Sequence, residues 1–293
     1  MNVEVLLGSR SFRGLSVKEI NNLLSRAYEI GICRIDSAPT YGEVEKNIGR
    51  ATRGKLNNKF KVCTKIMRYG DSHSAKNVNK SINKSLRNLK VEQIEIVYLH
   101  GTKFESIPEK TLQTLDKLLE KNGGGMVKNL GFAGDNLELV DAISANFFSH
   151  FLTTLNIVDQ NNINVIKANT DKVFTLKRIL ANHFWDRPDV NYAEKNEAAR
   201  RYEINDKVAI YQERSVSLKL EDEIFYAKQM RETFIRFAAY AHGVKGIVIG
   251  SSNFDHLNEC ISDLEKGPLP GDLFAKLEKI WRERSSNEWE TIS

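Results

Sequence analysis

Four polar side chains between residues 36 and 100 combine the groups needed to move a proton onto a carbonyl oxygen. They are Asp36 and Tyr41 in the stretch DSAPTYG, Lys65 in CTK, and His100 in YLHG. A carbonyl that accepts hydride at carbon gains negative charge on oxygen, and a positioned acid has to protonate that oxygen. Taken singly, each residue also has an ordinary interpretation as a turn, a cap or a solvated strand end. Taken together, they favour proton-transfer chemistry.

The four groups depend on one another, because a phenol is a poor acid near neutral pH. A lysine ammonium about 4 Å away stabilises a phenolate by about 1 kcal/mol in water, but by about 4 kcal/mol at an effective dielectric constant of about 20. Lys65 can therefore activate Tyr41 only in a pocket that excludes part of the water. Burial would tend to strip the proton from Lys65, and Asp36 opposes that loss by favouring the charged form. His100 can then donate a hydrogen bond that orients the substrate oxygen.

The elements that must position these groups are short, apolar, β-branched runs separated by helical patterns. The runs have the length and composition of buried parallel strands. They are Val3–Leu7, Ile32–Ile35, Phe60–Thr64, Ile94–Leu99, Val127–Phe132, Leu152–Ile157, Val173–Leu176 and Gly246–Ile249. Eight strands, each followed by a helical segment, predict an α/β fold of the (β/α)8 TIM-barrel type. A doubly wound open sheet is the competing architecture, but no GxGxxG motif opens a helix in this sequence.

In such a barrel, the four polar side chains fall at the carboxyl ends of neighbouring strands or in the loop that follows. That face is where barrel enzymes build their active sites. The interval from Ile179 to Ser217 is charged and irregular, so we expect an elaborated loop after the seventh strand. A C-terminal helical tail that carries Trp281 and Trp289 should pack on the outside of the barrel. No linker interrupts the pattern, and residues 1–293 are expected to form a single domain.

The composition excludes several classes of protein. Of the 293 residues, 41% are hydrophobic and 28% are charged, which is ordinary for a globular protein. A net charge of +5 is too small and too dispersed to indicate nucleic-acid binding. The three cysteines are far apart, so neither a zinc site, nor any other metal site, nor a disulfide framework is expected. The N-terminus does not have the pattern of a signal peptide, and no run approaches ~20 apolar residues, so the expected location is the cytoplasm, away from membranes.

Five segments carry a resemblance to a known family: DSAPTYG, CTK, YLHG, NLGFAGD and IVIGSSNFDHLNECI. In their order and spacing the sequence closely resembles the aldo-keto reductase family, over about residues 5–264 and most weakly between 179 and 217. The resemblance implies a (β/α)8 barrel that reduces an aldehyde or ketone with a nicotinamide cofactor, or oxidises the alcohol in reverse. Within the family, the chain looks most similar to bacterial NAD(P)H-dependent members. The residues that match the family's catalytic set are Asp36, Tyr41, Lys65 and His100.

The resemblance implies NADP as the cofactor, with NAD as the alternative. The turn after the eighth strand suits a phosphate, because backbone N–H groups are free at the start of a helix. Lys177 and Arg178 follow the seventh strand and would add positive charge at the pyrophosphate. His256 stands where the family places a basic residue near the 2′-phosphate, and Cys260 stands where an Asn near the adenine is usual. The full expected set is Gly8, Ser9, Asp36, Lys177, Arg178, Gly250, Ser251, Ser252, Asn253, His256 and Glu259.

One part of the family pattern is missing. The family usually binds the nicotinamide carboxamide with a Ser-Asn pair after the fifth strand and a Gln on the sixth, and those positions hold Ala133, Gly134 and Leu152 here. Each lost hydrogen bond is worth about 0.5–1.5 kcal/mol, so binding of the cofactor would weaken. Two of the cofactor assignments also have a structural alternative: Asn253 as an ordinary helix N-cap, and the Lys-Arg pair after the seventh strand as solvated charges.

The expected substrate is a small carbonyl compound or a sugar-like molecule, and the sequence leaves the oligomeric state open. The rim of the pocket is predicted to include Phe12, Arg13, Arg68, Tyr69 and Trp185. Two other interpretations compete with the enzyme. A barrel of the same descent could act as a non-catalytic binding or regulatory subunit, which the missing carboxamide partners favour. An isomerase barrel for a phosphate ligand would leave the tyrosine of the DSAPTYG stretch without a purpose. The complete catalytic set favours the reductase.

Overall fold

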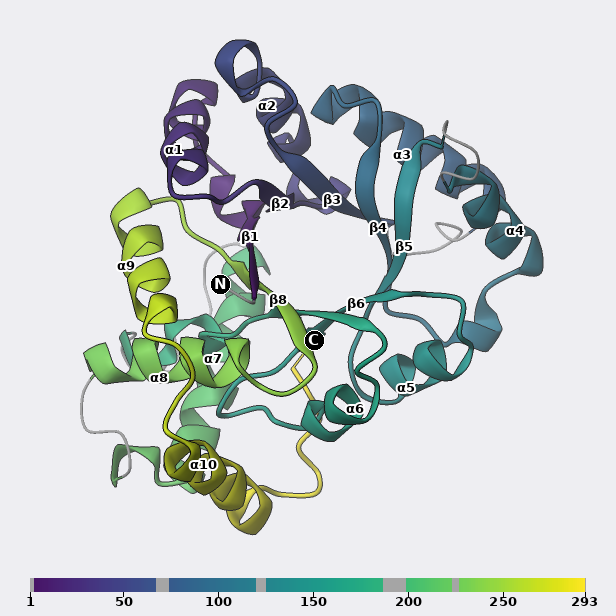
Figure 1. Ribbon diagram of the computed structural model, residues 1–293. Helices are drawn as coiled ribbons and strands as arrows, with labels where there is room; N and C mark the ends of the chain where they lie inside the picture. The colour runs from purple at the N-terminus through teal and green to yellow at the C-terminus, as the bar shows by residue number, and fades with distance from the viewer. Residues whose placement is uncertain (1–2, 67–73, 120–124, 187–198, 223–226, 293) are drawn as a thin grey trace.

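Eight parallel strands form a closed barrel at the centre of the protein (Figure 1). The structure is a computed structural model, and it describes residues 3–66, 74–119, 125–186, 199–222 and 227–292. The strands are β1 (Glu4–Gly8), β2 (Arg34–Asp36), β3 (Lys61–Ile66), β4 (Ile94–His100), β5 (Val127–Ala133), β6 (His150–Thr154), β7 (Val173–Lys177) and β8 (Val244–Ile249). Each strand pairs with the next, and β8 pairs with β1. The predicted (β/α)8 TIM barrel is confirmed, and the open-sheet alternative is wrong.

Helices surround the barrel (Figure 1). They are α1 (Val17–Glu29), α2 (Val44–Ala51), α3 (Ala75–Leu89), α4 (Glu109–Leu118), α5 (Asn136–Ser144), α6 (Ile163–Ala168), α7 (Ala199–Ser217), α8 (Ala227–Ala239), α9 (Phe254–Glu265) and α10 (Gly271–Arg284). The first of them shows how the local sequence sets a boundary. Ser16 and Glu19 exchange side-chain and backbone hydrogen bonds in a capping box, which satisfies N–H groups that the helix start leaves free.

Side chains inside the barrel alternate along the strands in layers. An apolar cluster inside the barrel comprises Leu6, Cys63, Ile96, Tyr98, Ala133 and Leu152. Because strand side chains repeat with a period of two, residues two positions further on point the same way. The next layer, at the carboxyl end, is therefore polar and includes Lys65, His100, Asp135 and Thr154. The fold thus gathers the predicted chemistry at one end of the barrel.

The sixth strand ends earlier than predicted. It stops at Thr154, although Leu155 and Ile157 continue the apolar run and are buried. Asn156 and Asp159 close a tight turn there, with backbone hydrogen bonds of 3.1 Å in both directions. Burial therefore continues after the chain has left the sheet, which is why the apolar run misled the prediction.

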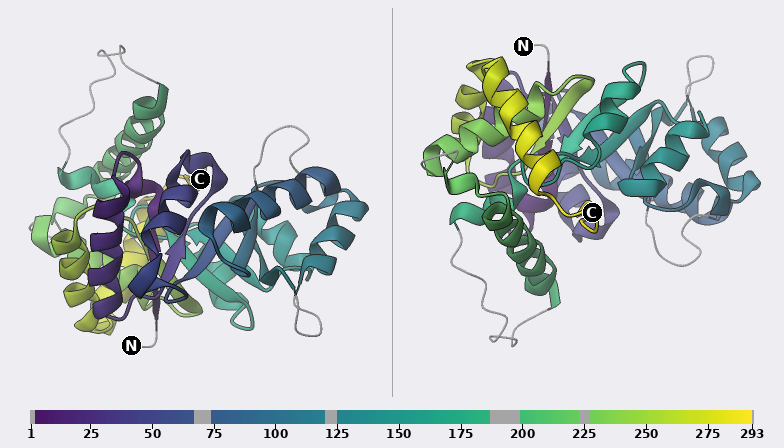
Figure 2. Two further views of the ribbon diagram at one scale, coloured as in Figure 1. Left: turned by 90° about the horizontal axis from the view of Figure 1, so that it is seen from above. Right: turned by 90° about the horizontal axis from the view of Figure 1, so that it is seen from below.

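The interval from Ile179 to Ser217 was expected to be an irregular loop, and this expectation is wrong in its second half. That half is the helix α7, which extends away from the barrel body (Figure 2). Its buried positions include Val208, Tyr211 and Arg214. A buried stripe that contains an arginine has a weak apolar signal, so the pattern did not reveal the helix.

After α10 the chain returns to the carboxyl end of the barrel, where its last segment lies over the ring of strands (Figure 1). The rings of Trp281 and Trp289 are 5.7 Å apart, and the second ring also faces the guanidinium of Arg214 at 5.1 Å. The backbone N–H of Ile292 donates to Asp159 Oδ2 at 2.9 Å. The tail therefore packs against the barrel on both its outer side and its mouth.

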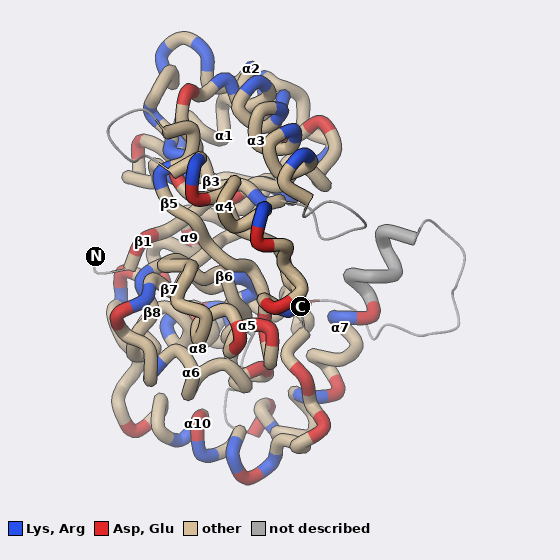
Figure 3. Tube along the Cα trace, turned by 90° about the vertical axis from the view of Figure 1, so that its right-hand side faces the viewer, with Lys and Arg blue, Asp and Glu red and all other residues tan. Residues whose placement is uncertain are grey.

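Charged residues lie along the outer helices (Figure 3). The helix α3 carries basic residues and no acidic one, whereas α10 mixes both signs. Among the helices in the described part of the chain, none combines the length and apolar character needed to cross a membrane. The charges that matter for the site are instead those at the barrel mouth.

Candidate active site

A buried ion pair between β2 and β3 forms the centre of the site. Lys65 Nζ donates to both carboxylate oxygens of Asp36, at 2.7 and 2.8 Å, and to the carbonyl of Ser37 at 2.9 Å. These three hydrogen bonds use all the N–H groups of the ammonium. Burial works to lower the pKa of Lys65, but the Asp36 carboxylate and smaller contributions outweigh burial, so the pKa is raised. Lys65 is therefore a fixed positive charge.

Tyr41 lies beside this pair, at the end of a short 3-10 turn that Pro39 begins. The ammonium of Lys65 is 5.8 Å from the centroid of the tyrosine ring. The guanidinium carbon of Arg13 is 5.3 Å from the same centroid, and Arg13 also donates to the carbonyl of Thr40 at 2.7 Å. Two cations thus approach the half-buried phenol, and one of them also holds the loop that carries it.

A cavity of about 240 Å³ opens at the carboxyl end of the barrel beside these residues, and we call it the mouth cavity. Asp36, Tyr41 and Lys65 line it together. Of the predicted cofactor residues, it is lined by Gly8, Asp36, Lys177, Arg178 and Gly250. Lining residues that the sequence did not reveal include Arg10, Ser11, Asn182 and His183. Their positions in loops carry no periodic signal, and only the fold shows that they face the mouth.

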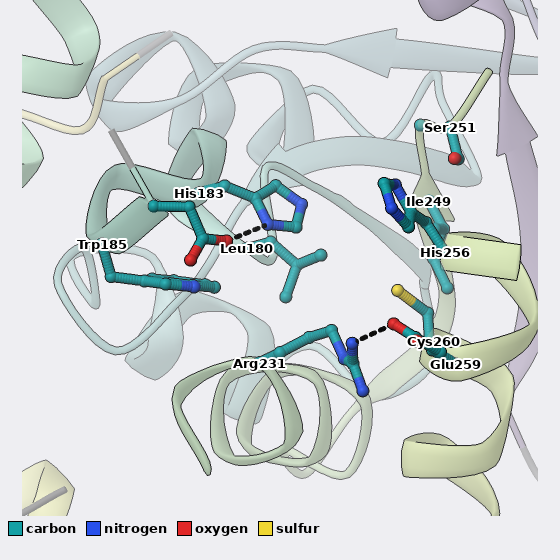
Figure 4. A pocket seen from close by; sticks show the side chains of 11 residues that line it. Leu180, His183, Trp185, Arg231, Ile249, Ser251, His256, Glu259 and Cys260 are labelled. Carbon is teal, nitrogen blue, oxygen red and sulfur yellow. Dashed lines mark hydrogen bonds and ion pairs between the residues drawn. The ribbon is translucent and has the colours of Figure 1, made fainter. Parts of the chain in front are cut away.

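A second cavity of about 490 Å³ lies between α8, α9 and the turn after β7, and we call it the side cavity (Figure 4). The predicted residues that line it are Trp185, Gly250, Ser251, His256 and Glu259. Four residues line both cavities: Leu180, His183, Ile249 and Gly250. The two chambers therefore adjoin at these residues, and we call them together the cleft.

Charges in the side cavity are paired before any ligand arrives. Arg231 of α8, which the sequence did not reveal, donates to Asp263 Oδ2 at 2.7 Å and to Glu259 (Figure 4). His183 Nδ1 lies 3.8 Å from a carboxylate oxygen of Asp186. Burial also raises the pKa of the neighbouring Cys260 thiol to about 11, which keeps that side chain neutral. This chamber thus offers directional polar groups rather than a strong positive field.

The junction of the two chambers fits an elongated, phosphate-containing molecule. The turn that leads into α9 passes this junction at Gly250, and the first turn of the helix reaches the side cavity through His256. A helix N-terminus attracts phosphate. A Cβ on Gly8 would lie 2.9 Å from Val248 Cγ1 and 3.3 Å from Gly250 Cα, so glycine keeps the backbones close and the cleft open. Asn253 caps α9, because its Oδ1 accepts from the N–H of Asp255 at 2.8 Å. The residues thus fit a dinucleotide that runs from the side cavity to the mouth cavity.

Several predicted residues lie away from the lining of this cleft. Ser9 is fully buried, and Phe12 is a fully buried member of the hydrophobic core. The assignment of Phe12 to the pocket rim is therefore corrected, because its ring is used in packing. His100 ends β4 half-buried and lines neither cavity. Arg68 and Tyr69 lie outside the described residues. Ser252 and Asn253, in the turn before α9, are exposed and line neither cavity.

The two cations at the end of β7, Lys177 and Arg178, have partners other than those expected. Lys177 donates to Asp135 Oδ2 at 2.7 Å, and Arg178 donates to the carbonyl of Ile292. Both still line the mouth cavity, but their hydrogen bonds hold them at β5 and at the C-terminal tail. The absent side chain at Gly134 also has a steric reason, since a Cβ there would lie 2.4 Å from the ring of Phe132.

The segment after β7 holds an unusual backbone where it lines both chambers. Arg178, Ala181, Asn182 and His183 all have positive φ, between 43° and 55°. Residues other than glycine adopt this conformation at a cost of about 1 kcal/mol or more, and keep it only where surrounding contacts enforce it. One such contact is the amide of Asn156, which donates to the carbonyl of Arg178 at 2.9 Å. The wall of the cleft is therefore held in place by neighbouring segments.

Comparisons with known proteins point the same way as this geometry. A model of the aldo/keto reductase family matches residues 4–282. D-arabinose 1-dehydrogenase from Saccharomyces cerevisiae is 30% identical over 129 residues, which is 41% of this chain and 38% of that protein. L-galactose dehydrogenase from Arabidopsis thaliana is 29% identical over 119 residues, 39% of this chain and 37% of that protein. The chain thus matches less than two fifths of the length of either relative.

Solved structures share the architecture at low sequence identity. An aldo-keto reductase from Bacillus halodurans superposes with a TM-score of 0.72 at 16% identity, covering 97% of this chain and 94% of that one. A glycerol dehydrogenase from Gluconobacter oxydans superposes with a TM-score of 0.68 at 18% identity, covering 97% of this chain and 93% of that one. Identities this low establish a common fold.

Proposed function

Because the chain belongs to the aldo-keto reductase family, we propose that it reduces a small sugar-like aldehyde or ketone with NAD(P)H, or oxidises the corresponding alcohol. The two dehydrogenases that it partly matches are named for D-arabinose and L-galactose, which supports a sugar as the substrate class. A bound nicotinamide would supply or accept the hydride. Binding, orientation and the proton would be the work of this chain's own residues.

One observation carries this proposal: the ammonium of buried Lys65, whose pKa Asp36 raises, lies 5.8 Å from the ring centroid of Tyr41 on the wall of a cavity. At about 6 Å, a positive charge stabilises a developing negative charge by roughly 3 kcal/mol at an effective dielectric constant of about 20, and by less than about 1 kcal/mol in water. A sheltered barrel mouth is what makes the interaction useful. In this proposal Tyr41 protonates the carbonyl oxygen in reduction and takes the proton back in oxidation, and Asp36 keeps Lys65 charged. His100, at the end of β4 next to β3, is proposed to donate to the substrate oxygen, although it lines neither of the two cavities.

The proposed dinucleotide is NADP, with NAD as the alternative. A 2′-phosphate in the side cavity would meet Arg231 already paired with Glu259 and Asp263. In this proposal, the balance between the charge of Arg231 and the charges of its two acidic partners sets the preference for NADP or NAD. Titration with NADPH and with NADH, monitored by the quenching of protein fluorescence, measures the two affinities directly.

Replacement of Tyr41 by Phe tests the proposed function. Tyr41→Phe should lower turnover of a test aldehyde by about 10²–10⁴-fold, because the proton donor is lost, and should leave the Kd for NADPH within about twofold. Tyr28→Phe, on the exposed side of α1, makes the same chemical change away from the cleft and should be neutral. Near-normal turnover in Tyr41→Phe would contradict the assigned role. A wild-type protein that binds neither NADPH nor NADH would favour the non-catalytic alternative.

A further inference from the structure

A second buried ion pair lies across the barrel mouth from Lys65 and Asp36. Lys177, the last residue of β7, donates to Asp135, which follows β5. The strands β3 and β7 are four places apart in a closed ring of eight, so their ends face each other across the mouth. Both ammonium groups line the mouth cavity, and they do so from opposite sides.

The two lysines differ in what their ammonium groups have left to donate. Lys65 has three acceptors, as described above. Among the described residues, the ammonium of Lys177 has one acceptor, Asp135 Oδ2. Its side chain is 20% exposed, and it lines the mouth cavity. Within the described part of the chain, two N–H groups of Lys177 therefore have no acceptor and can donate to a ligand in that cavity.

Asp135 fixes the position of this ammonium. The carboxylate accepts from Thr153 Oγ1 at 2.8 Å, from the N–H of Thr154 at 2.7 Å and from Asn162 Nδ2 at 3.2 Å, in addition to Lys177. Burial works to raise the pKa of Asp135, but Lys177 and these donors outweigh burial and lower it. The Asp135 carboxylate is therefore charged and held in place by its hydrogen bonds, so it does not turn toward a ligand.

The chemistry around Lys177 selects the kind of ligand it can hold. The ion pair is neutral as a whole, so its free donors suit a neutral acceptor such as an amide oxygen better than a second anion. Leu152, Val248 and Ile249 add apolar wall to the same cavity. A flat ring with one amide group matches this combination, and Tyr41 lies on the opposite wall.

We propose that Lys177 donates a hydrogen bond to the carboxamide oxygen of the nicotinamide ring and so holds the ring's reacting edge toward Tyr41. Lys177 is then a positioning residue, fixed by Asp135. It replaces the hydrogen-bonding side chains that are missing at Ala133, Gly134 and Leu152. The inference rests on the proposed function, because it takes a nicotinamide dinucleotide as the ligand. It assigns Lys177 to the ring rather than to the pyrophosphate.

The experiment compares ligands with and without the ring in a charge-balanced variant. Lys177→Met combined with Asp135→Asn removes both charges, so no unpaired buried charge remains. The Kd for NADH and for NADPH should rise about tenfold to a hundredfold, as expected for the loss of a hydrogen bond from a charged group. The Kd for ADP-ribose, which has both phosphates but no nicotinamide, should stay within about twofold. Lys172→Met is the matched control, because that lysine precedes β7 at the other end of the strand and donates to Asn146.

Each alternative role gives a different result. Equal losses for ADP-ribose and the dinucleotides would assign Lys177 to the pyrophosphate and overturn the proposal. Unchanged dinucleotide affinity with a raised KM for the carbonyl would assign it to the substrate and also overturn the proposal. Wild-type protein that binds none of these ligands would instead contradict the proposed function itself. Lys177→Arg keeps the ion pair and should restore part of the affinity, which answers the case in which the double variant fails to fold.

Discussion

In the proposed mechanism, Lys65 acts on Tyr41 through charge rather than through a donated hydrogen bond. Its three N–H groups are used by Asp36 and Ser37, and the centroid of the Tyr41 ring lies 5.8 Å from Nζ. Electrostatic action of this kind depends on the ammonium staying protonated and on the exclusion of water. In the proposed mechanism, the catalytic competence of Tyr41 therefore rests on Asp36, which does not itself have to touch the substrate.

This dependence predicts a change in the pH profile when Asp36 is neutralised. The Asp36 carboxylate raises the pKa of Lys65, so wild-type Lys65 stays charged well into alkaline solution. In Asp36→Asn, burial dominates and lowers the pKa of Lys65, so the charge is lost at lower pH. The alkaline limb of kcat/KM for reduction should move down by about one to three pH units.

The pH at which kcat/KM falls is read from each variant's own profile, so a smaller folded fraction lowers the whole profile without moving that pH. Asp272→Asn, on exposed α10, is the matched control and should keep the wild-type limb. Superimposable alkaline limbs in Asp36→Asn and wild type would show that Lys65 does not need this partner.

At the scale of elements, the cleft depends on how the segments after β6 and β7 hold each other. Asn156 is fully buried, and its Oδ1 accepts from the N–H of Val158 while its Nδ2 donates to the carbonyl of Arg178. The amide of Asn156 thus closes the turn after β6 and holds Arg178, whose backbone is left-handed, at the start of the segment after β7. The geometry of the cleft is set by side-chain contacts between loops as well as by the barrel.

Replacement of Asn156 by Ala should therefore weaken ligand binding without touching the ligand. The lost hydrogen bonds should lower the free energy of unfolding by about 1–3 kcal/mol, and the Kd for NADH should rise several-fold because Arg178 and its neighbours are no longer held. Asn169→Ala removes a comparable bond to the carbonyl of Val165 at the end of α6. That control should lower stability slightly and leave the Kd unchanged. Equal binding by both variants would refute the role of Asn156.

The elements were predictable to the extent that a local pattern marks them. Short apolar runs between helical patterns located all eight strands, because buried parallel strands have that composition. The end of β6 was misplaced because Leu155 and Ile157 stay buried after the chain leaves the sheet. The partner of Lys177 was out of reach, since Asp135 is 42 residues away and only barrel closure brings them together.

At the scale of the whole molecule, the C-terminal tail joins distant parts of the chain at a buried carboxyl group. Asp159 has no exposed surface, accepts from the N–H of Ile292 and lies 3.4 Å from Arg214 of α7. Burial raises the pKa of Asp159 to about 7, although Arg214 acts in the opposite direction. The grouping of residues 1–293 into a single domain stays a prediction, and this contact is one of those that would support it.

Asp159 gives folding a defined pH dependence. Unfolded Asp loses its proton near pH 4, whereas folded Asp159 keeps it until about pH 7. The contribution of this group to stability is therefore full below about pH 4 and is lost as the pH rises toward 7, by up to roughly 4 kcal/mol. Asp159→Asn removes this titrating group. The free energy of unfolding of the variant, measured with urea, should therefore rise relative to that of wild type between pH 5 and pH 8. A constant difference across that range would contradict the raised pKa.

Closure of the barrel between β1 and β8 has a consequence for how the protein is made. Glu4 is paired with Gly246, so β1 keeps one vacant edge until β8 has been synthesised. The floor of the cleft, where Gly8 meets Gly250, does not exist before that moment. The proposed dinucleotide site is thus completed only late in synthesis, and until then the unpaired edge of β1 needs protection from aggregation.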